Sequence, residues 1–168
     1  MATFFSLCIL FLISGNLFLK TNAAAMDDIC RQTKNPSLCV AAMNTDPRSR
    51  TAALPQLAQI TVDTAEYTAG QTKIRIHGFV MSEKNPRKQK MYSQCEDFYV
   101  DALAALNIAP EDLKKRRYVD LDMQMGLARR AVDRCEAAFM HESPFRKDNE
   151  LVGILADAVA IMARTLSR

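Results

Sequence analysis

Residues 27–39 read DDICRQTKNPSLC and set two cysteines, Cys30 and Cys39, on either side of an Asn-Pro-Ser turn. Asn35 can cap a helix, and Pro36 can take its first position, because proline lacks only a backbone donor that has no partner there. The stretch therefore predicts two short helical segments joined by a tight turn. Helices this short are marginal in water on their own, so something must hold them.

The residues before this stretch have the layout of a secretory signal peptide. Residues 4–19, FFSLCILFLISGNLFL, are apolar, and the small residues TNAAA follow at 21–25. The apolar run is short for a membrane-spanning helix, and no later run reaches bilayer length. We therefore expect residues 1–25 to be cleaved. An uncleaved N-terminal anchor is the alternative, because no lysine or arginine precedes Lys20.

Cleavage would remove Cys8 and leave four cysteines, Cys30, Cys39, Cys95 and Cys135. In an oxidising compartment this even count indicates two disulfides. Four cysteines allow three pairings, and sequence alone does not choose among them. Pairing Cys30 with Cys39 and Cys95 with Cys135 is the simplest, because helical segments of suitable length lie between the members of each pair. The spacing does not suit a zinc site, and we expect no metal and no cofactor.

Apolar residues recur at helical spacing through most of the remaining chain, with few glycines and with prolines at the expected helix ends. Long helices are expected over about residues 49–82, from Pro86 to the residues before Pro110, over about 117–140 and over about 147–166. Pro110 should interrupt the second helix, with EDLKKRR, residues 111–117, forming a short exposed turn.

The chain after residue 25 is about 140 residues long, enough for a single domain with its own core. Four long amphipathic helices with short connections predict an all-α fold, an up-down-up-down four-helix bundle over residues 47–168. A disulfide-linked helical hairpin would occupy residues 26–46. Without Lys20 the formal net charge falls from +3 to +2, a balance that does not suggest a nucleic-acid partner.

Three stretches carry a family resemblance: ICRQTKNPSLC at 29–39, YSQCEDFYVDALAAL at 92–106, and CEAAF at 135–139 followed by SPF. They resemble the N-terminal hairpin, the second bundle helix and the junction of the third and fourth helices in the plant family of pectin methylesterase inhibitors and invertase inhibitors. The resemblance covers essentially the whole chain after the signal segment. In that family the two hairpin cysteines are bonded to each other.

The resemblance implies a secreted inhibitor, and not an enzyme, that binds a carbohydrate-active plant enzyme one-to-one and covers its substrate cleft. The expected location is the apoplast or cell wall, with the vacuole as the alternative. We expect a monomer or a weak homodimer. A cytokine-type ligand would need long crossover connections that this chain lacks, and a lipid carrier would need an apolar cavity that sequence does not reveal.

Pectin methylesterase is the expected target, and acid invertase is the alternative. The N-terminal half, residues 28–49, looks like inhibitors of the esterase, but the Thr-Cys-Glu-Asp often seen in them reads Arg-Cys-Glu-Ala at 134–137. CEAAF with SPF is closer to the invertase inhibitors. The Pro-Lys-Phe tripeptide of some invertase inhibitors would fall at 118–120, where this chain has Tyr-Val-Asp. Both signatures are incomplete, and we favour the esterase.

Candidate partner-binding residues lie on the third bundle helix. Asp120, Gln124 and Leu127 share one face, at helical spacings of four and three. Tyr118 precedes the helix, and tyrosine is a favoured interface anchor. Each of these residues could instead be an ordinary solvated or packing residue.

Charged residues supply further candidates. Arg134 and Glu136 flank Cys135, and charges there would help to select a partner and speed the encounter. The basic run KKRR at 114–117 is typical of a solvated turn, but it could also associate with anionic pectin.

Overall fold

The computed structural model describes residues 25–140 and 142–168, so nearly all of the expected signal segment lies outside the described residues. The elements in chain order are α2 (Pro36–Met43), the 3-10 turn η1 (Pro47–Arg50), α3 (Leu54–Ser82), α4 (Pro86–Lys114), α5 (Tyr118–Ala138) and α6 (Arg146–Leu166). Residues 25–30 are also helical. Within the described ranges, no helix combines the length and apolar character needed to cross a membrane.

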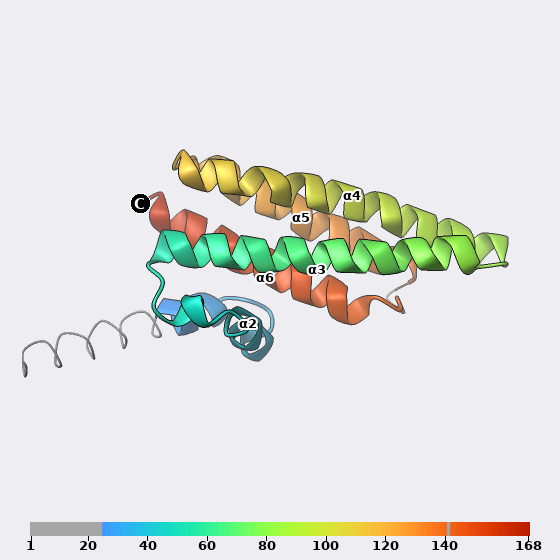
Figure 1. The fold of residues 1–168 in the computed structure, drawn as a ribbon, viewed down its shortest axis with the longest axis horizontal. Helices are drawn as coiled ribbons and strands as arrows, with labels where there is room; N and C mark the ends of the chain where they lie inside the picture. The colour runs from blue at the N-terminus through green and yellow to red at the C-terminus, as the bar shows by residue number, and fades with distance from the viewer. Residues whose placement is uncertain (1–24, 141) are drawn as a thin grey trace, which may run out of the picture.

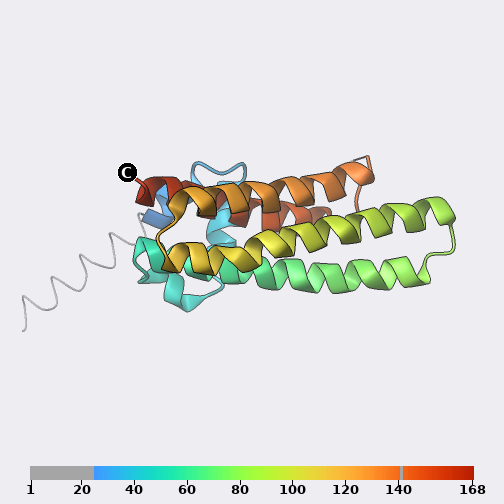
Figure 2. The same cartoon turned by 90° about the horizontal axis from the view of Figure 1, so that it is seen from above.

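The four long helices, α3 to α6, form an antiparallel bundle (Figure 1). Around the bundle, α3 packs against α4, α4 against α5, α5 against α6, and α6 back against α3. The expected up-down-up-down topology is therefore confirmed. Because α3 and α4 have 29 residues each, and α5 and α6 have 21 each, the turn between α3 and α4 extends beyond the turn between α5 and α6 (Figure 2).

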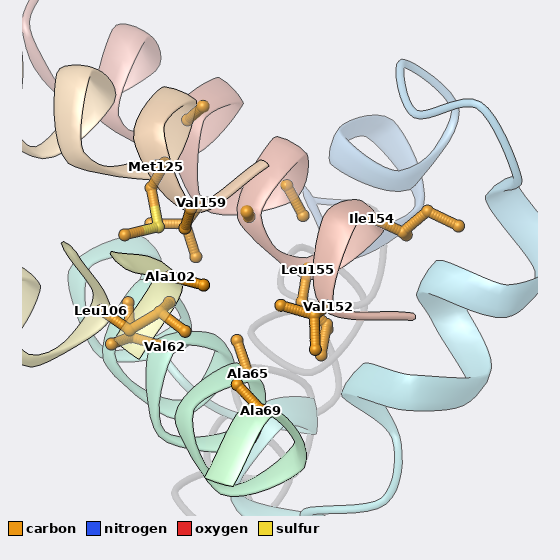
Figure 3. Packing of buried hydrophobic residues seen from close by; sticks show 14 of the residues in the cluster. Val62, Ala65, Ala69, Ala102, Leu106, Met125, Val152, Ile154, Leu155 and Val159 are labelled. Carbon is orange, nitrogen blue, oxygen red and sulfur yellow. The ribbon is translucent and has the colours of Figure 1, made fainter. Parts of the chain in front are cut away.

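Small side chains let these helices approach closely. Buried alanines occur on the inward faces of all four helices, among them Ala65, Ala102, Ala128 and Ala158. Larger buried side chains, including Leu106, Met125 and Val159, fill the space between the helices (Figure 3). Close packing of this kind supplies most of the favourable free energy of folding, through burial of apolar surface.

The N-terminal hairpin, residues 25–46, covers one side of the bundle. Its helix α2 packs against α6 and α3, and Asn35 Nδ2 in the hairpin turn donates to Glu150 Oε1 of α6 at 3.0 Å. Ile154 of α6 points away from the other labelled core side chains, toward the hairpin (Figure 3). The opposite side of the bundle, formed by α4 and α5, is left uncovered by the hairpin (Figure 1).

Two disulfides join neighbouring helical segments. Cys30 is bonded to Cys39 with a Cα–Cα distance of 5.5 Å, and Cys95 is bonded to Cys135 with a Cα–Cα distance of 4.5 Å. Of the three pairings that four cysteines allow, the structure contains the local one. The first bond closes the hairpin, and the second fixes the position of α4 along α5.

The first bundle helix begins later than the sequence pattern predicts. The pattern predicts a start at about residue 49, whereas α3 begins at Leu54. Pro47 and Pro55 each stand in the first turn of their own element, η1 and α3. Because proline suits a first turn and cannot donate a hydrogen bond within a helix, Pro55 starts a new helix instead of continuing one.

The expected break at Pro110 is wrong, because α4 continues through this residue to Lys114. Proline inside a helix removes one backbone hydrogen bond and crowds the preceding turn. The turn after Pro110 nevertheless buries Asp112 and Leu113, and this packing keeps it helical. Residues 111–114 are therefore the last turn of α4 and not a separate exposed turn.

Candidate functional site

A groove of about 510 Å³ lies between α4 and α5, on the side of the bundle away from the hairpin. Its lining residues are Asp101, Ala104, Ala105 and Ile108 of α4 and Gln124, Leu127, Arg130, Ala131 and Arg134 of α5. Ala105 and Ala131 are buried and form its floor. Because alanine side chains are short, they leave space between the two helices. The longer side chains of the neighbouring lining residues form the walls of this space.

A stripe of exposed apolar side chains follows α5 beside this groove. Val119, Met123 and Leu127 stand at intervals of four residues, and they are 76%, 56% and 44% exposed. Across the groove, Ile108 of α4 is 45% exposed. Single exposed apolar residues are common, but a contiguous row of them is typical of a protein interaction surface. We call Val119, Met123 and Leu127 the α5 ridge.

Two arginines give the groove a positive rim. The Arg134 guanidinium carbon lies 4.2 Å from the ring centre of Phe98 on α4, which holds this side chain across the helix pair. Arg130 extends back along α5, with Nη1 lying 3.4 Å from the position that a Cβ on Gly126 would occupy. Neither arginine forms an ion pair with a carboxylate of the described residues, so both charges are available to a partner.

The structure brings together three of the six residues singled out in the sequence. Gln124, Leu127 and Arg134 line the α4–α5 groove. Asp120 lies about one helical turn before Gln124 and faces Arg117, with 3.7 Å between Oδ2 and Nε. It is therefore near the end of the groove without lining it.

Tyr118 and Glu136 are engaged in contacts within the protein. Tyr118 is partly buried against the core. Glu136 faces α6, where its two oxygens accept hydrogen bonds from Asn149 Nδ2 at 2.9 Å and Arg146 Nε at 3.1 Å. Asn149 Oδ1 in turn accepts from the buried Tyr99 hydroxyl at 2.8 Å. Burial raises the pKa of Tyr99, so its hydroxyl stays protonated and keeps donating. This network links α4, α5 and α6.

The sequence reasoning missed the α4 side of the groove, including Asp101 and Ile108. The disulfide could have located it, because Cys95 and Cys135 set the register of two antiparallel helices. Ile108 lies 13 residues after Cys95, and Gln124 lies 11 residues before Cys135. In an antiparallel pair these similar separations place the two residues at nearly the same height along the helix axes. Antiparallel helices have the same rise per residue, so this counting needs no structure once the pairing is known.

A second groove, of about 300 Å³, lies between α5, α6 and the hairpin turn, and Lys34 and Glu150 are among its lining residues. Most of its charges are paired internally. Arg129 lies 2.9 Å from Asp133 Oδ2 and 3.1 Å from Asp157 Oδ2. Among the described residues, no group of three or more histidines, cysteines or carboxylates is placed to hold a metal ion. The second groove therefore offers a partner less free charge than the α4–α5 groove.

The family model for plant invertase/pectin methylesterase inhibitors matches residues 24–162 of the chain. The chain belongs to this family. Its members are proteinaceous inhibitors, so the protein is an inhibitor and not a catalyst. The family resemblance of the hairpin and the cysteine framework is confirmed.

The relatives of this inhibitor carry the names of both subclasses. It is 32% identical to a pectinesterase inhibitor of Actinidia deliciosa over 135 residues, 79% of this chain and 73% of that protein. It is 28% identical to a putative invertase inhibitor of Platanus orientalis over 164 residues, 94% of each chain. The crystal structure of mutant form A of a pectin methylesterase inhibitor from Arabidopsis has a similar fold, with a TM-score of 0.74, 24% identity and coverage of 83% of this chain and 95% of that chain.

Proposed function

We propose that the inhibitor is secreted to the apoplast and blocks a pectin methylesterase by one-to-one binding over its substrate cleft. The observation that carries the proposal is the uncovered α4–α5 groove, which Gln124, Leu127 and Arg134 line. The inhibitors of Actinidia deliciosa and Arabidopsis thaliana that resemble the chain are named for this esterase. The two disulfides suit an oxidising compartment outside the cytosol.

The groove suits recognition of a rigid enzyme surface. Helices α4 and α5 are tied by Cys95–Cys135, and the Arg134 side chain is held against Phe98, so little ordering entropy is lost on binding. The α5 ridge would supply apolar area at the centre of the contact. Arg130 and Arg134 would select an acidic rim on the enzyme and speed the encounter. The protein would act as a monomer or weak homodimer that leaves this face free.

Acid invertase is the second candidate target. The putative invertase inhibitors of Platanus orientalis and Platanus acerifolia align with 94% of the chain. The same groove would then face the invertase, because it is the uncovered side of the bundle. A vacuolar location would suit this alternative.

A parallel titration distinguishes the two targets. Residues 26–168, with both disulfides formed, would be titrated against a plant pectin methylesterase and a plant acid invertase at about pH 5–6. We expect stoichiometric loss of esterase activity with the invertase unaffected. Loss of invertase activity alone would reverse the assignment, and no effect on either enzyme would contradict the inhibitory function.

A further inference from the structure

The turn between α3 and α4 concentrates positively charged side chains that form no ion pair within the described chain. We call residues 83–90 the α3–α4 tip. It carries four cations, Lys84, Arg87, Lys88 and Lys90, and one carboxylate, Glu83. Residues 84–90 are all exposed. None of the four cations forms an ion pair with a described carboxylate, and Glu83 Oε1 accepts the backbone N–H of Asn85 at 2.8 Å.

The positions of these cations destabilise the N-terminal end of α4. Arg87, Lys88 and Lys90 lie at the start of α4, whose first turn contains no acidic residue. The N-terminal end of a helix already carries a partial positive charge, so cations there are unfavourable. Like charges within one or two turns also repel each other. Asn85 caps this helix, but no carboxylate in its first turn offsets the positive charges, and an unfavourable cluster of this kind is a candidate functional site.

The other basic run, residues 114–117, is explained by the fold. It lies at the C-terminal end of α4, where the helix dipole favours cations. Lys115 Nζ lies 2.8 Å from Glu111 Oε1, and Arg117 Nη2 lies 2.6 Å from Asp112 Oδ1. Half of this run is therefore paired within the protein, whereas no cation of the α3–α4 tip is.

The tip is also placed to meet a ligand without obstructing the α4–α5 groove. It projects beyond the turn between α5 and α6 (Figure 2), so a long polymer could approach it from several sides. Along α4, Arg87 precedes the groove residue Asp101 by 14 positions, or about 20 Å. A ligand at the tip and an enzyme on the groove could therefore be bound at the same time.

We propose that the α3–α4 tip binds an acidic polysaccharide, a polymer of uronate units with free carboxylates. Lysine and arginine side chains on a projecting turn can follow a flexible polyanion, because each contact is electrostatic and needs little geometric precision. The identity of the polymer rests on the proposed function: a pectin methylesterase converts neutral ester groups into carboxylates. The tip would therefore hold the inhibitor where the esterase has already acted.

A binding experiment without any enzyme tests this proposal. Affinity electrophoresis of residues 26–168 at low salt would use polygalacturonate and, separately, highly methyl-esterified pectin as probes. The tip variant is Lys84→Gln/Arg87→Gln/Lys88→Gln/Lys90→Gln. The matched control is Arg50→Gln/Lys114→Gln/Lys115→Gln/Arg168→Gln, which removes the same number of positive charges at the other end of the bundle.

We expect the unmodified protein to bind polygalacturonate in a salt-sensitive way and the esterified polymer much more weakly. The tip variant should lose about tenfold in affinity, as expected for four exposed ion pairs, and the control should change little. Absence of binding to polygalacturonate, equal binding to the two polymers, or equal loss in both variants would overturn the proposal. Polymer binding is measured without any enzyme, so its outcome is independent of the inhibition experiment. Failure to inhibit either enzyme would contradict the proposed function and not the polymer site.

Discussion

At the scale of single residues, Arg116 holds a backbone conformation that is unfavourable for a residue with a side chain. Its φ is +55°, in the left-handed region that favours glycine. The conformation closes the end of α4: Arg117 N–H donates to the carbonyl of Asp112 at 2.8 Å, and Arg116 N–H donates to that of Leu113 at 3.1 Å. These two hydrogen bonds form the usual capping pattern at the C-terminal end of a helix. Glycine commonly occupies the left-handed position of this pattern, and here Arg116 occupies it.

Arg116→Gly should therefore stabilise the protein. We expect the free energy of unfolding to rise by about 0.5–1 kcal/mol, because the relief of left-handed strain exceeds the added entropy of glycine in the unfolded chain. Urea denaturation measures the change. Arg116→Ala, which removes the same charge but keeps the Cβ, is the control and should give no such gain. Equal effects of both variants would show that charge, and not backbone strain, is responsible.

Asp157 makes the free energy of unfolding depend on pH, and the direction of this dependence follows from its pKa. Burial raises the pKa of this carboxyl above its usual 3.8, although Arg129 Nη1 lies 3.1 Å away. The folded protein then holds a proton that the unfolded chain has lost, so ionisation of Asp157 increasingly favours unfolding as the pH rises above about 3.8. Asp157→Asn should remove this contribution.

The expected result for Asp157→Asn is that its free energy of unfolding, relative to the unmodified protein, increases between about pH 3 and pH 7. Urea denaturation at several pH values measures this difference. Asp133→Asn removes the exposed partner of the same Arg129 and a charge that helps to raise the pKa of Asp157, so it should show a smaller increase. A relative stability of Asp157→Asn that falls with rising pH would mean that the ion pair with Arg129 outweighs burial.

The directions of Arg134 and Glu136 could have been deduced in part from the sequence. Successive helical residues differ by about 100°, so two residues separated by Cys135 point to nearly opposite sides of α5. They could not both face one partner from the same groove. Which of them faces α6 depends on the packing of α6, and the hydrogen bond to Asn149 from that helix decides it.

At the scale of elements, the two disulfides should contribute unequally to stability. The Cys30–Cys39 bond closes a loop of about ten residues, worth about 2.7 kcal/mol in the loop-closure model, and the Cys95–Cys135 bond closes a loop of about 41 residues, worth roughly 3.9 kcal/mol. The second bond also joins two bundle helices, α4 and α5, whereas the first holds a peripheral hairpin.

Cys95→Ala/Cys135→Ala should therefore lower the free energy of unfolding more than Cys30→Ala/Cys39→Ala, by about 1 kcal/mol. Guanidinium denaturation of the two double variants measures the difference. Each variant is the other's control, because each removes one disulfide and two buried cysteines. A larger loss from the hairpin pair would indicate that the hairpin, and not the α4–α5 contact, limits the stability of the bundle.

Element prediction succeeded where one local rule acted alone. Asn35 caps α2 by accepting from the N–H of Leu38, and α4 begins at Pro86, as the sequence predicts. It failed at Pro110, where buried packing outweighs the local preference. For α6 the sequence stripe indicated a single apolar face, but the structure buries residues on nearly every side. The hairpin that covers the additional face lies far away in the sequence, so periodicity cannot reveal it.

At the scale of the whole molecule, three regions of the bundle are separated in space. The hairpin covers α3 and α6, and the groove lies between α4 and α5. The α3–α4 tip extends at one end (Figure 2). Sequence alone left three cysteine pairings open, but the fold class and the presence of two disulfides could be predicted, because they depend on helix periodicity, loop length and cysteine count. The groove could not, because it depends on which faces the hairpin leaves open.

The central claim, that the α4–α5 groove contacts the target enzyme, is tested most directly by one substitution and its control. Leu127→Arg changes the α5 ridge, and Ile74→Arg changes an apolar residue of α3 that is 66% exposed and lies outside the groove. Both variants would be titrated against the pectin methylesterase, with thermal unfolding confirming that each is folded.

We predict that Leu127→Arg weakens inhibition by about thirtyfold or more, the loss expected for a central apolar contact, and that Ile74→Arg leaves it unchanged. Full inhibition by Leu127→Arg, or an equal loss in Ile74→Arg, would contradict the assignment of the groove as the contact surface.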